Sequence, residues 1–226
     1  MLTRDELEVV GLSLKVAFAS VAASLPLAVG AAWLLARRDF PGKTLFDALV
    51  HLPLVLPPVV IGYALLLAFG RSGPLGAMLE PLGIVFSFRW TGAALAAAVM
   101  GFPLMVRAIR LSMEAIDPRI EAAGRTLGAG PWRAFLTLTL PLAWPGLVTG
   151  SLLGFARSLG EFGATITFVS NIPGETQTLP LAIYGATQLP GGNDQALRLS
   201  IVSVLLSLAA LAASEWLTRR RIGSRA

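Results

Sequence analysis

The stretch EAAGRTLGAGPWRAFLTLTLPLAWPG, from Glu121 to Gly146, separates two long apolar runs and is the longest amphipathic, arginine-bearing piece of the chain. Glycine and proline interrupt it at Gly128, at Gly130–Pro131 and at Pro141. This punctuation predicts a helix, a tight turn and a second short helix that ends at Leu140–Pro141. A polar helix–turn–helix between two membrane-buried segments must contact something outside the bilayer.

The composition indicates a membrane protein. Of the 226 residues, 55% are hydrophobic and only 14% are charged, with a mean hydropathy of +0.72. A soluble domain of this size does not need so much apolar surface, so we expect an all-α membrane protein that crosses the bilayer several times. The chain has no cysteine and a single histidine, His51. Disulfides, thiolate metal sites and cysteine nucleophiles are therefore excluded, and we expect no metal centre and no cofactor.

A membrane-spanning helix needs roughly 20 mostly apolar residues. The hydropathy pattern predicts five such spans, at about 10–36, 45–69, 90–108, 142–162 and 197–217. The apolar segment Thr178–Ala186 is too short to span, so we expect it to lie on the membrane surface or to re-enter it. There is no 20–50-residue repeat, and we interpret residues 1–226 as a single membrane domain.

The basic residues orient these spans, because Lys and Arg concentrate in cytoplasmic loops. One side would carry Arg37, Arg38, Lys43, Arg107, Arg110, Arg119, Arg125, Arg133, Arg219, Arg220, Arg221 and Arg225. The other side would carry only Arg4, Arg71, Arg89 and Arg198. We therefore expect the N-terminus outside, and the C-terminus and the Glu121–Gly146 stretch in the cytoplasm.

Small residues and prolines suggest how the spans pack. Gly146, Gly150 and Gly154 recur every fourth residue, which allows close approach of another helix, either within one bundle or across a dimer. The second span contains Pro57 and Pro58, so it either lines a transport path or is simply kinked.

Charged residues inside the spans are candidate functional groups. Arg157 and Glu161 are four residues apart on the fourth span, so they share one helix face and can pair. They either lock the bundle as a neutral pair or form an outer gate on an anion path. Lys15 and Arg107 lie near the ends of spans and can extend towards the headgroups, which favours a structural role.

The chain does not carry a nucleotide site of its own. Phe40–Thr44, FPGKT, has the end of a phosphate-binding loop, but Arg37 stands where that motif needs its first glycine. No strand is predicted before it. An intramembrane enzyme would need a nucleophile and a base, and His51 has no evident partner. A stand-alone secondary transporter would be expected to show an inverted repeat, which is absent.

The Glu121–Gly146 stretch resembles the cytoplasmic "EAA" loop of the inner-membrane permease subunits of bacterial binding-protein-dependent ABC importers. The matching residues, within a loop at 117–141, are Glu121, Ala122, Ala123, Gly124, Gly128, Pro131, Leu140 and Pro141. Glu121 lies one residue further from Gly128 than in the general consensus. The five-span layout agrees with the same family, so the resemblance covers nearly the whole chain.

Further motifs are similar to the molybdate and sulfate branch of this family, and to its molybdate members in particular. They are SLGEFGAT (Ser158–Thr165), TLPLAIY (Thr178–Tyr184), LSLKVA (Leu12–Ala17) and LPLVLPPVVIGY (Leu52–Tyr63).

The resemblance implies a type I importer bundle of the MetI-like kind in the bacterial inner membrane. Two copies of the permease would assemble with two copies of a cytoplasmic ATPase and receive molybdate or tungstate from a periplasmic binding protein. Sulfate or thiosulfate is the alternative substrate, and nucleic acid is not an expected partner. The loop would couple the ATPase to the spans, and the candidate path or gate residues are Arg157, Ser158, Glu161, Thr165, Pro57 and Pro58.

Overall fold

The computed structural model describes residues 2–222, with side chains described through residue 210 and at residue 212. All regular elements in this range are helical. In chain order they are α1 Arg4–Arg37, α2 Lys43–Val55, α3 Pro58–Phe69, α4 Pro74–Leu79, the 3₁₀ turn η1 Glu80–Leu82, α5 Trp90–Glu114, α6 Pro118–Thr126, α7 Pro131–Ala134, the π-helical turn η2 Phe135–Thr139, α8 Leu140–Leu142, α9 Trp144–Leu159, α10 Gly163–Val169, α11 Leu179–Thr187 and α12 Asn193–Ile222.

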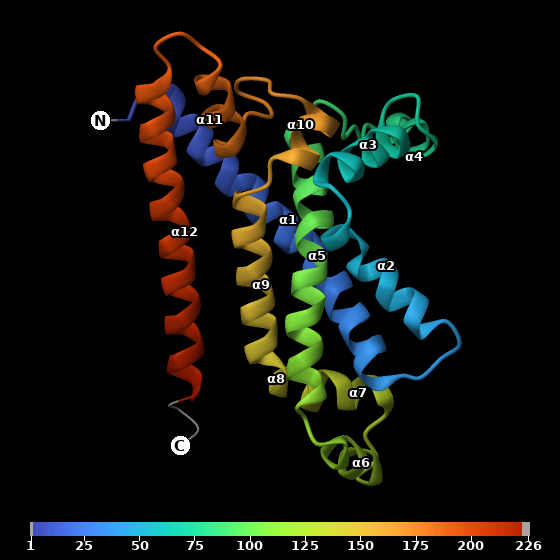
Figure 1. The fold of residues 1–226 in the computed structure, drawn as a ribbon. Helices are drawn as coiled ribbons and strands as arrows, with labels where there is room; N and C mark the ends of the chain where they lie inside the picture. The colour runs from blue at the N-terminus through green and yellow to red at the C-terminus, as the bar shows by residue number, and fades with distance from the viewer. Residues whose placement is uncertain (1, 223–226) are drawn as a thin grey trace.

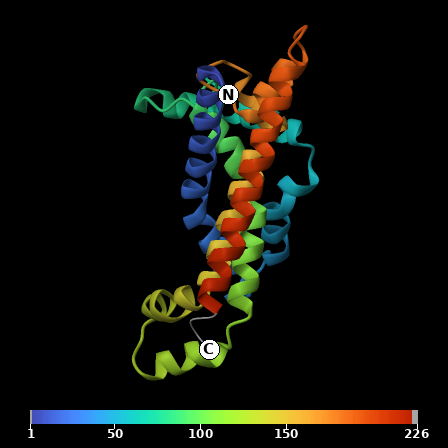
Figure 2. The same cartoon turned by 90° about the vertical axis from the view of Figure 1, so that its left-hand side faces the viewer.

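The long helices form a bundle centred on α5 and α9 (Figure 1). Helix α1 crosses behind both of them, α12 packs along α9, and α2 packs against α5. The short helices α3, α4, α10 and α11 gather at one end of the bundle, whereas α6 and α7 lie at the other end (Figures 1 and 2). Helix α1 begins at the α11 end, and α12 ends towards the α6 end.

Two helices, α1 and α5, are each long and apolar enough to cross a membrane, among the residues whose structure is described. Two bent pairs also qualify if each pair counts as one span: α2 with α3, and the Pro131–Leu142 segment with α9. The fifth expected span falls within α12, where the side chains of residue 211 and of residues 213–222 lie outside the described set. The basic residues expected there, Arg219, Arg220, Arg221 and Arg225, are likewise outside it.

The second span is not the continuous helix that hydropathy predicts. Helix α2 ends at Val55 and α3 begins at Pro58, with a bend of 113° between them. Pro57 and Pro58 explain the break, because proline has no N–H to continue the helical ladder but is well suited to a first turn. Residues 45–69 are therefore a broken span or a re-entrant segment.

The glycines of α9 serve packing within the chain. A Cβ at Gly150 would come 3.1 Å from the Ile109 side chain, and one at Gly154 would come 2.7 Å from Met105 Sδ. Both neighbours belong to α5. The stripe of small residues therefore brings α9 and α5 into close contact in one bundle.

Polar contacts join the first part of α1 to distant parts of the chain. Thr3 and Glu6 form a capping box at the start of α1. Arg198, at the start of α12, donates from Nη2 to Glu6 Oε1 at 2.9 Å. Ser13 Oγ accepts from the Leu179 amide at 2.7 Å, which attaches α11 to α1.

Candidate functional site

The polar segment between α5 and α9 folds into short helices at one end of the bundle. Asp117 caps α6 by accepting from the Arg119 amide at 2.9 Å, and Pro118 occupies the first turn. Gly128 follows α6 with φ = +86°, a conformation that glycine adopts without steric cost. The chain then turns into α7 at Pro131.

The second half of this segment is helical, as the sequence predicts. The helical run continues through η2 and α8 to Leu142, one residue beyond the predicted end at Leu140–Pro141. Pro141 lies in the first turn of α8, where a proline is tolerated. Helix α9 then begins at Trp144, with a bend of 69° from the preceding segment. The segment therefore leads almost directly into α9.

Glu121 connects three elements. Its Oε1 accepts from Arg37 Nε at 2.9 Å and from Thr139 Oγ1 at 2.8 Å, which joins α6 to the end of α1 and to η2. Arg37 also donates from Nη2 to the Ile116 carbonyl at 3.2 Å. The Arg37 and Glu121 side chains are only 12% and 15% exposed. The carboxylate is therefore directed into the fold.

The outer surface of α6 and of the turn that follows it carries small and apolar groups beside the exposed Arg119 and Arg125. Ala122 and Ala123 are exposed, as are Gly128 and Pro131. Gly124 faces inwards, because a Cβ there would meet Leu138 Cδ1 at 2.5 Å. Leu127 is 89% exposed and Trp132 is 75% exposed, which is unusual for large apolar side chains. This surface has the character of a protein-docking surface.

A second polar group lies where α9 ends and α10 begins. Arg157 Nη1 is 2.6 Å from Glu161 Oε2, and Glu161 Oε1 accepts from the Ala164 amide at 2.8 Å. The Glu161 side chain is 2% exposed, whereas that of Arg157 is 27% exposed. The charges therefore pair, as their spacing predicts.

The structure gathers most of the candidate path residues around this break. Ser158 Oγ is 2.8 Å from Ser20 Oγ of α1, and Thr165 is buried. A Cβ at Gly163 would lie 2.7 Å from Pro58 Cβ, so the start of α3 packs on the start of α10. Pro57, by contrast, is exposed at the α2–α3 bend.

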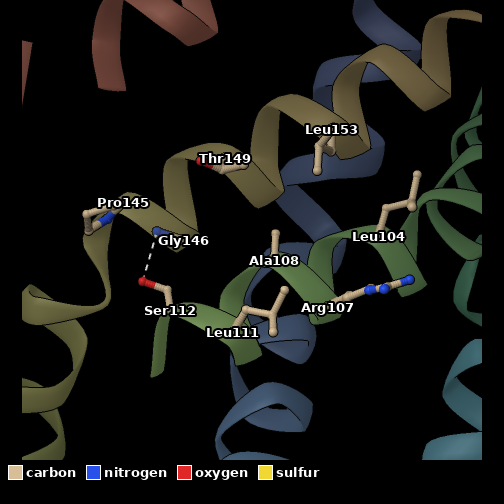
Figure 3. Close-up of a pocket in the computed structure, with 9 residues that line it drawn as sticks. All are labelled: Leu104, Arg107, Ala108, Leu111, Ser112, Pro145, Gly146, Thr149 and Leu153. Carbon is tan, nitrogen blue, oxygen red and sulfur yellow. Dashed lines mark hydrogen bonds between the residues drawn. The ribbon is translucent and has the colours of Figure 1, made fainter. Parts of the chain in front are cut away.

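A groove of about 450 Å³ runs between α5 and α9 (Figure 3). The residues that line it are Leu104, Arg107, Ala108, Leu111, Ser112, Pro145, Gly146, Thr149 and Leu153. Helix α1 lies behind the two helices, so the groove opens on the face turned away from α1. The sequence expectations did not include this groove, although the spacing of Leu104, Ala108 and Leu111 on α5 is that of one helix face.

The sequence matches a known family over most of its length. Residues 24–223 match the family described as "Binding-protein-dependent transport system inner membrane component". The chain belongs to this family. It is 59% identical over 220 residues to the "Molybdenum transport system permease protein ModB" of Escherichia coli (strain K12). This alignment covers 97% of this chain and 96% of that protein. The protein with the same description from Haemophilus influenzae is 58% identical over 216 residues, and the alignment covers 95% of this chain and 94% of that protein.

Solved structures of the same fold support the architecture. A chain of the bacterial ABC transporter involved in the import of the acidic polysaccharide alginate superposes with a TM-score of 0.76. The superposition covers 97% of this chain and 80% of that one, at 16% sequence identity. The helical fold is therefore that of ABC importer membrane subunits.

Proposed function

We propose that this chain is the membrane permease subunit of an ATP-driven importer for molybdate. The observation that carries the proposal is the 59% identity to a molybdenum transport permease along almost the full length of both chains. The chain is a transport subunit and not an enzyme. ATP hydrolysis belongs to a separate subunit of such importers.

In this proposal two copies of the chain form the translocation path. Each copy crosses the inner membrane five times, with α2–α3 as a broken span and the α6 end of the bundle in the cytoplasm. A periplasmic binding protein delivers the oxyanion to the opposite end, near α10 and α11. The excess of arginines near α6 supports this orientation.

Helix α6 and the loop to α7 dock on the ATPase. The exposed Leu127 and Trp132 and the small Ala122 and Ala123 support this role, because small residues allow close approach and large apolar ones favour burial. Movement of α6 reaches α1 through Glu121 and Arg37, and it reaches α9 through η2 and α8. In this proposal the α5–α9 groove is part of the translocation path. Because α9 forms one wall of the groove, ATP-driven movement of α6 changes the width of the path.

At the other end, the break between α9 and α10 forms the outer part of the path. The pairing of Arg157 with Glu161 keeps this region electrically neutral while the path is closed. The packing of Pro58 on Gly163 couples α3 to the same break.

The test is ATP-dependent uptake of labelled molybdate by the chain reconstituted with its ATPase and binding protein, with tungstate and sulfate as competitors. Uptake that tungstate inhibits and excess sulfate does not is the expected result. Equal inhibition by sulfate would assign the chain to sulfate transport instead. Transport without the ATPase would contradict the importer assignment altogether.

A further inference from the structure

Arg107 lies in the α5–α9 groove without a partner for its charge. Its side chain is exposed, and its neighbours along α5 are the apolar Leu104, Ala108 and Leu111. Among the residues with described side chains, no ion pair or hydrogen bond involves the Arg107 guanidinium. Arg110, three residues later, is instead held by Asp47 at 3.2 Å and by Glu114 at 2.7 Å.

The guanidinium extends along α5 towards the middle of that helix. In Figure 3 it lies on the Leu104 side of its own backbone position, away from Ser112. Side chains of a helix lean towards its N-terminus, which accounts for this direction. Ser112 marks the end of α5 that leads to α6, so an arginine that extended to the cytoplasmic headgroups would point the opposite way. The side chain is therefore not positioned to reach the nearer membrane surface.

An unpaired guanidinium facing hydrocarbon is costly, about 2.5–3.5 kcal/mol at the centre of a spanning helix and less towards its ends, where Arg107 lies. Water or an anion beside Arg107 would remove this cost. Thr149, on the opposite wall, adds a hydroxyl, whereas Ser112 Oγ is already bonded to the Gly146 amide at 3.2 Å. Among the described residues that line the groove, Arg107 is the one charged side chain, and Ser112 and Thr149 carry the two hydroxyls.

Building on the proposed function, we propose that Arg107 is the residue that attracts the oxyanion in the half of the path nearer the ATPase. A single guanidinium attracts a dianion without enclosing it, which suits a path that must also release its cargo. Arg157 is the weaker candidate for this role because Glu161, 2.6 Å away, neutralises it. The ligand class is a small tetrahedral oxyanion such as molybdate.

The absence of cysteine from the chain allows the charge to be removed and restored chemically. Arg107→Cys introduces a unique thiol into the permease, which is reconstituted with a cysteine-free ATPase and binding protein. We expect molybdate uptake per ATP hydrolysed to fall at least about tenfold, because a charge pair at close range contributes more than 1.4 kcal/mol at a partly exposed site. Modification with an ethylammonium methanethiosulfonate should restore much of the uptake, and the neutral methyl reagent should not.

Three controls separate this role from a structural one. Leu104→Cys places a thiol in the same groove without removing a charge, so neither reagent should raise its uptake. Arg107→Lys keeps the charge and should keep most of the uptake. Binding-protein-stimulated ATP hydrolysis by Arg107→Cys should match that of the unchanged transporter, because a disrupted bundle would lose hydrolysis as well.

Unchanged molybdate uptake by Arg107→Cys, or equal recovery with the neutral reagent, would overturn the proposal. Loss of uptake together with loss of stimulated hydrolysis would also overturn it in favour of a structural role. If the unchanged transporter imported no molybdate, the proposed function itself would fail. The two failures are therefore distinguishable.

Discussion

Glu121 Oε1 accepts two hydrogen bonds at once, from Arg37 Nε at 2.9 Å and from Thr139 Oγ1 at 2.8 Å. Arg37 is the last residue of α1, and Thr139 is the last residue of η2. One carboxylate therefore holds α6 against both of the elements through which its movement must pass. It fixes α6 to the bundle, while the surface of α6 that we propose docks on the ATPase stays exposed.

Replacing Glu121 should loosen α6. Glu121→Ala removes the acceptor for a charged donor and a hydroxyl, and hydrogen bonds to charged groups contribute about 1.5–3 kcal/mol each. Because the pair is partly exposed, we expect the loss of stabilising free energy to lie in the lower part of that range. Hydrogen exchange of the α6 amides should become faster, and molybdate uptake per ATP hydrolysed should fall.

Arg125→Ala is the matched control for Glu121→Ala. Arg125 and Glu121 both line a cavity of about 540 Å³ between α1, α6, α7 and η2, and no ion pair is seen for Arg125 among the described side chains. Its replacement should leave exchange of the α6 amides nearly unchanged. The double variant Arg37→Glu with Glu121→Arg exchanges the two charges and should recover part of the molybdate uptake per ATP hydrolysed. No recovery would argue that the two residues act separately.

Gly128 tests the docking surface. Its φ of +86° makes any other residue strained by about 1–2 kcal/mol, but a Cβ there would meet no atom within 4 Å. Gly128→Ala should therefore be tolerated with a modest loss. Gly128→Trp should insert into the membrane normally and yet uncouple ATP hydrolysis from uptake, because its ring would occupy the surface that receives the ATPase.

Gly83→Trp controls for the backbone strain in this test. Gly83 has φ = +74° and the same free space, but it lies in the η1 turn at the opposite end of the bundle. Normal uptake by Gly128→Trp, or equal loss with Gly83→Trp, would speak against docking at Gly128.

Arg157 and Glu161 should be coupled energetically. Arg157→Ala leaves the Glu161 carboxylate buried without its counter-charge, and breaking a buried pair in this way costs about 3–5 kcal/mol. Because Arg157 is partly exposed, we expect the loss in free energy of unfolding to lie near the lower end of that range. Arg157→Ala combined with Glu161→Gln removes the orphan charge and keeps an acceptor for the Ala164 amide, so its melting temperature in detergent should exceed that of Arg157→Ala. A double variant no more stable than the single one would exclude the pairing as a source of stability.

The orientation can be measured with impermeant thiol reagents, because the chain has no cysteine of its own. Gly130→Cys, in the exposed turn before α7, should be labelled only from the cytoplasmic side. Ser72→Cys, in the exposed turn before α4 at the other end of the bundle, should be labelled only from outside. Labelling of both from one side would contradict an odd number of crossings between these ends.

The amino-acid sequence alone determined the class of the protein and the local elements. The apolar composition predicts membrane helices, and Gly128 and Pro131 mark the turn after α6 because glycine and proline act on their own backbone. The pairing of Arg157 with Glu161 was likewise predictable, since residues four apart on a helix are neighbours. The sequence predicted an irregularity at Pro57–Pro58 but not that the helix ends there, because sequence alone does not say whether a proline kinks a helix or ends it.

Only the tertiary structure decided which distant residues meet. Glu121 and Arg37 are 84 residues apart, and nothing in the helical periodicity of either segment selects the other. The same holds for Pro58 with Gly163, and for the α5–α9 groove that contains Arg107. Periodicity specifies the face of a helix that is buried, whereas the packing of all the helices together specifies which helix covers it and which charged side chain is left facing an open groove.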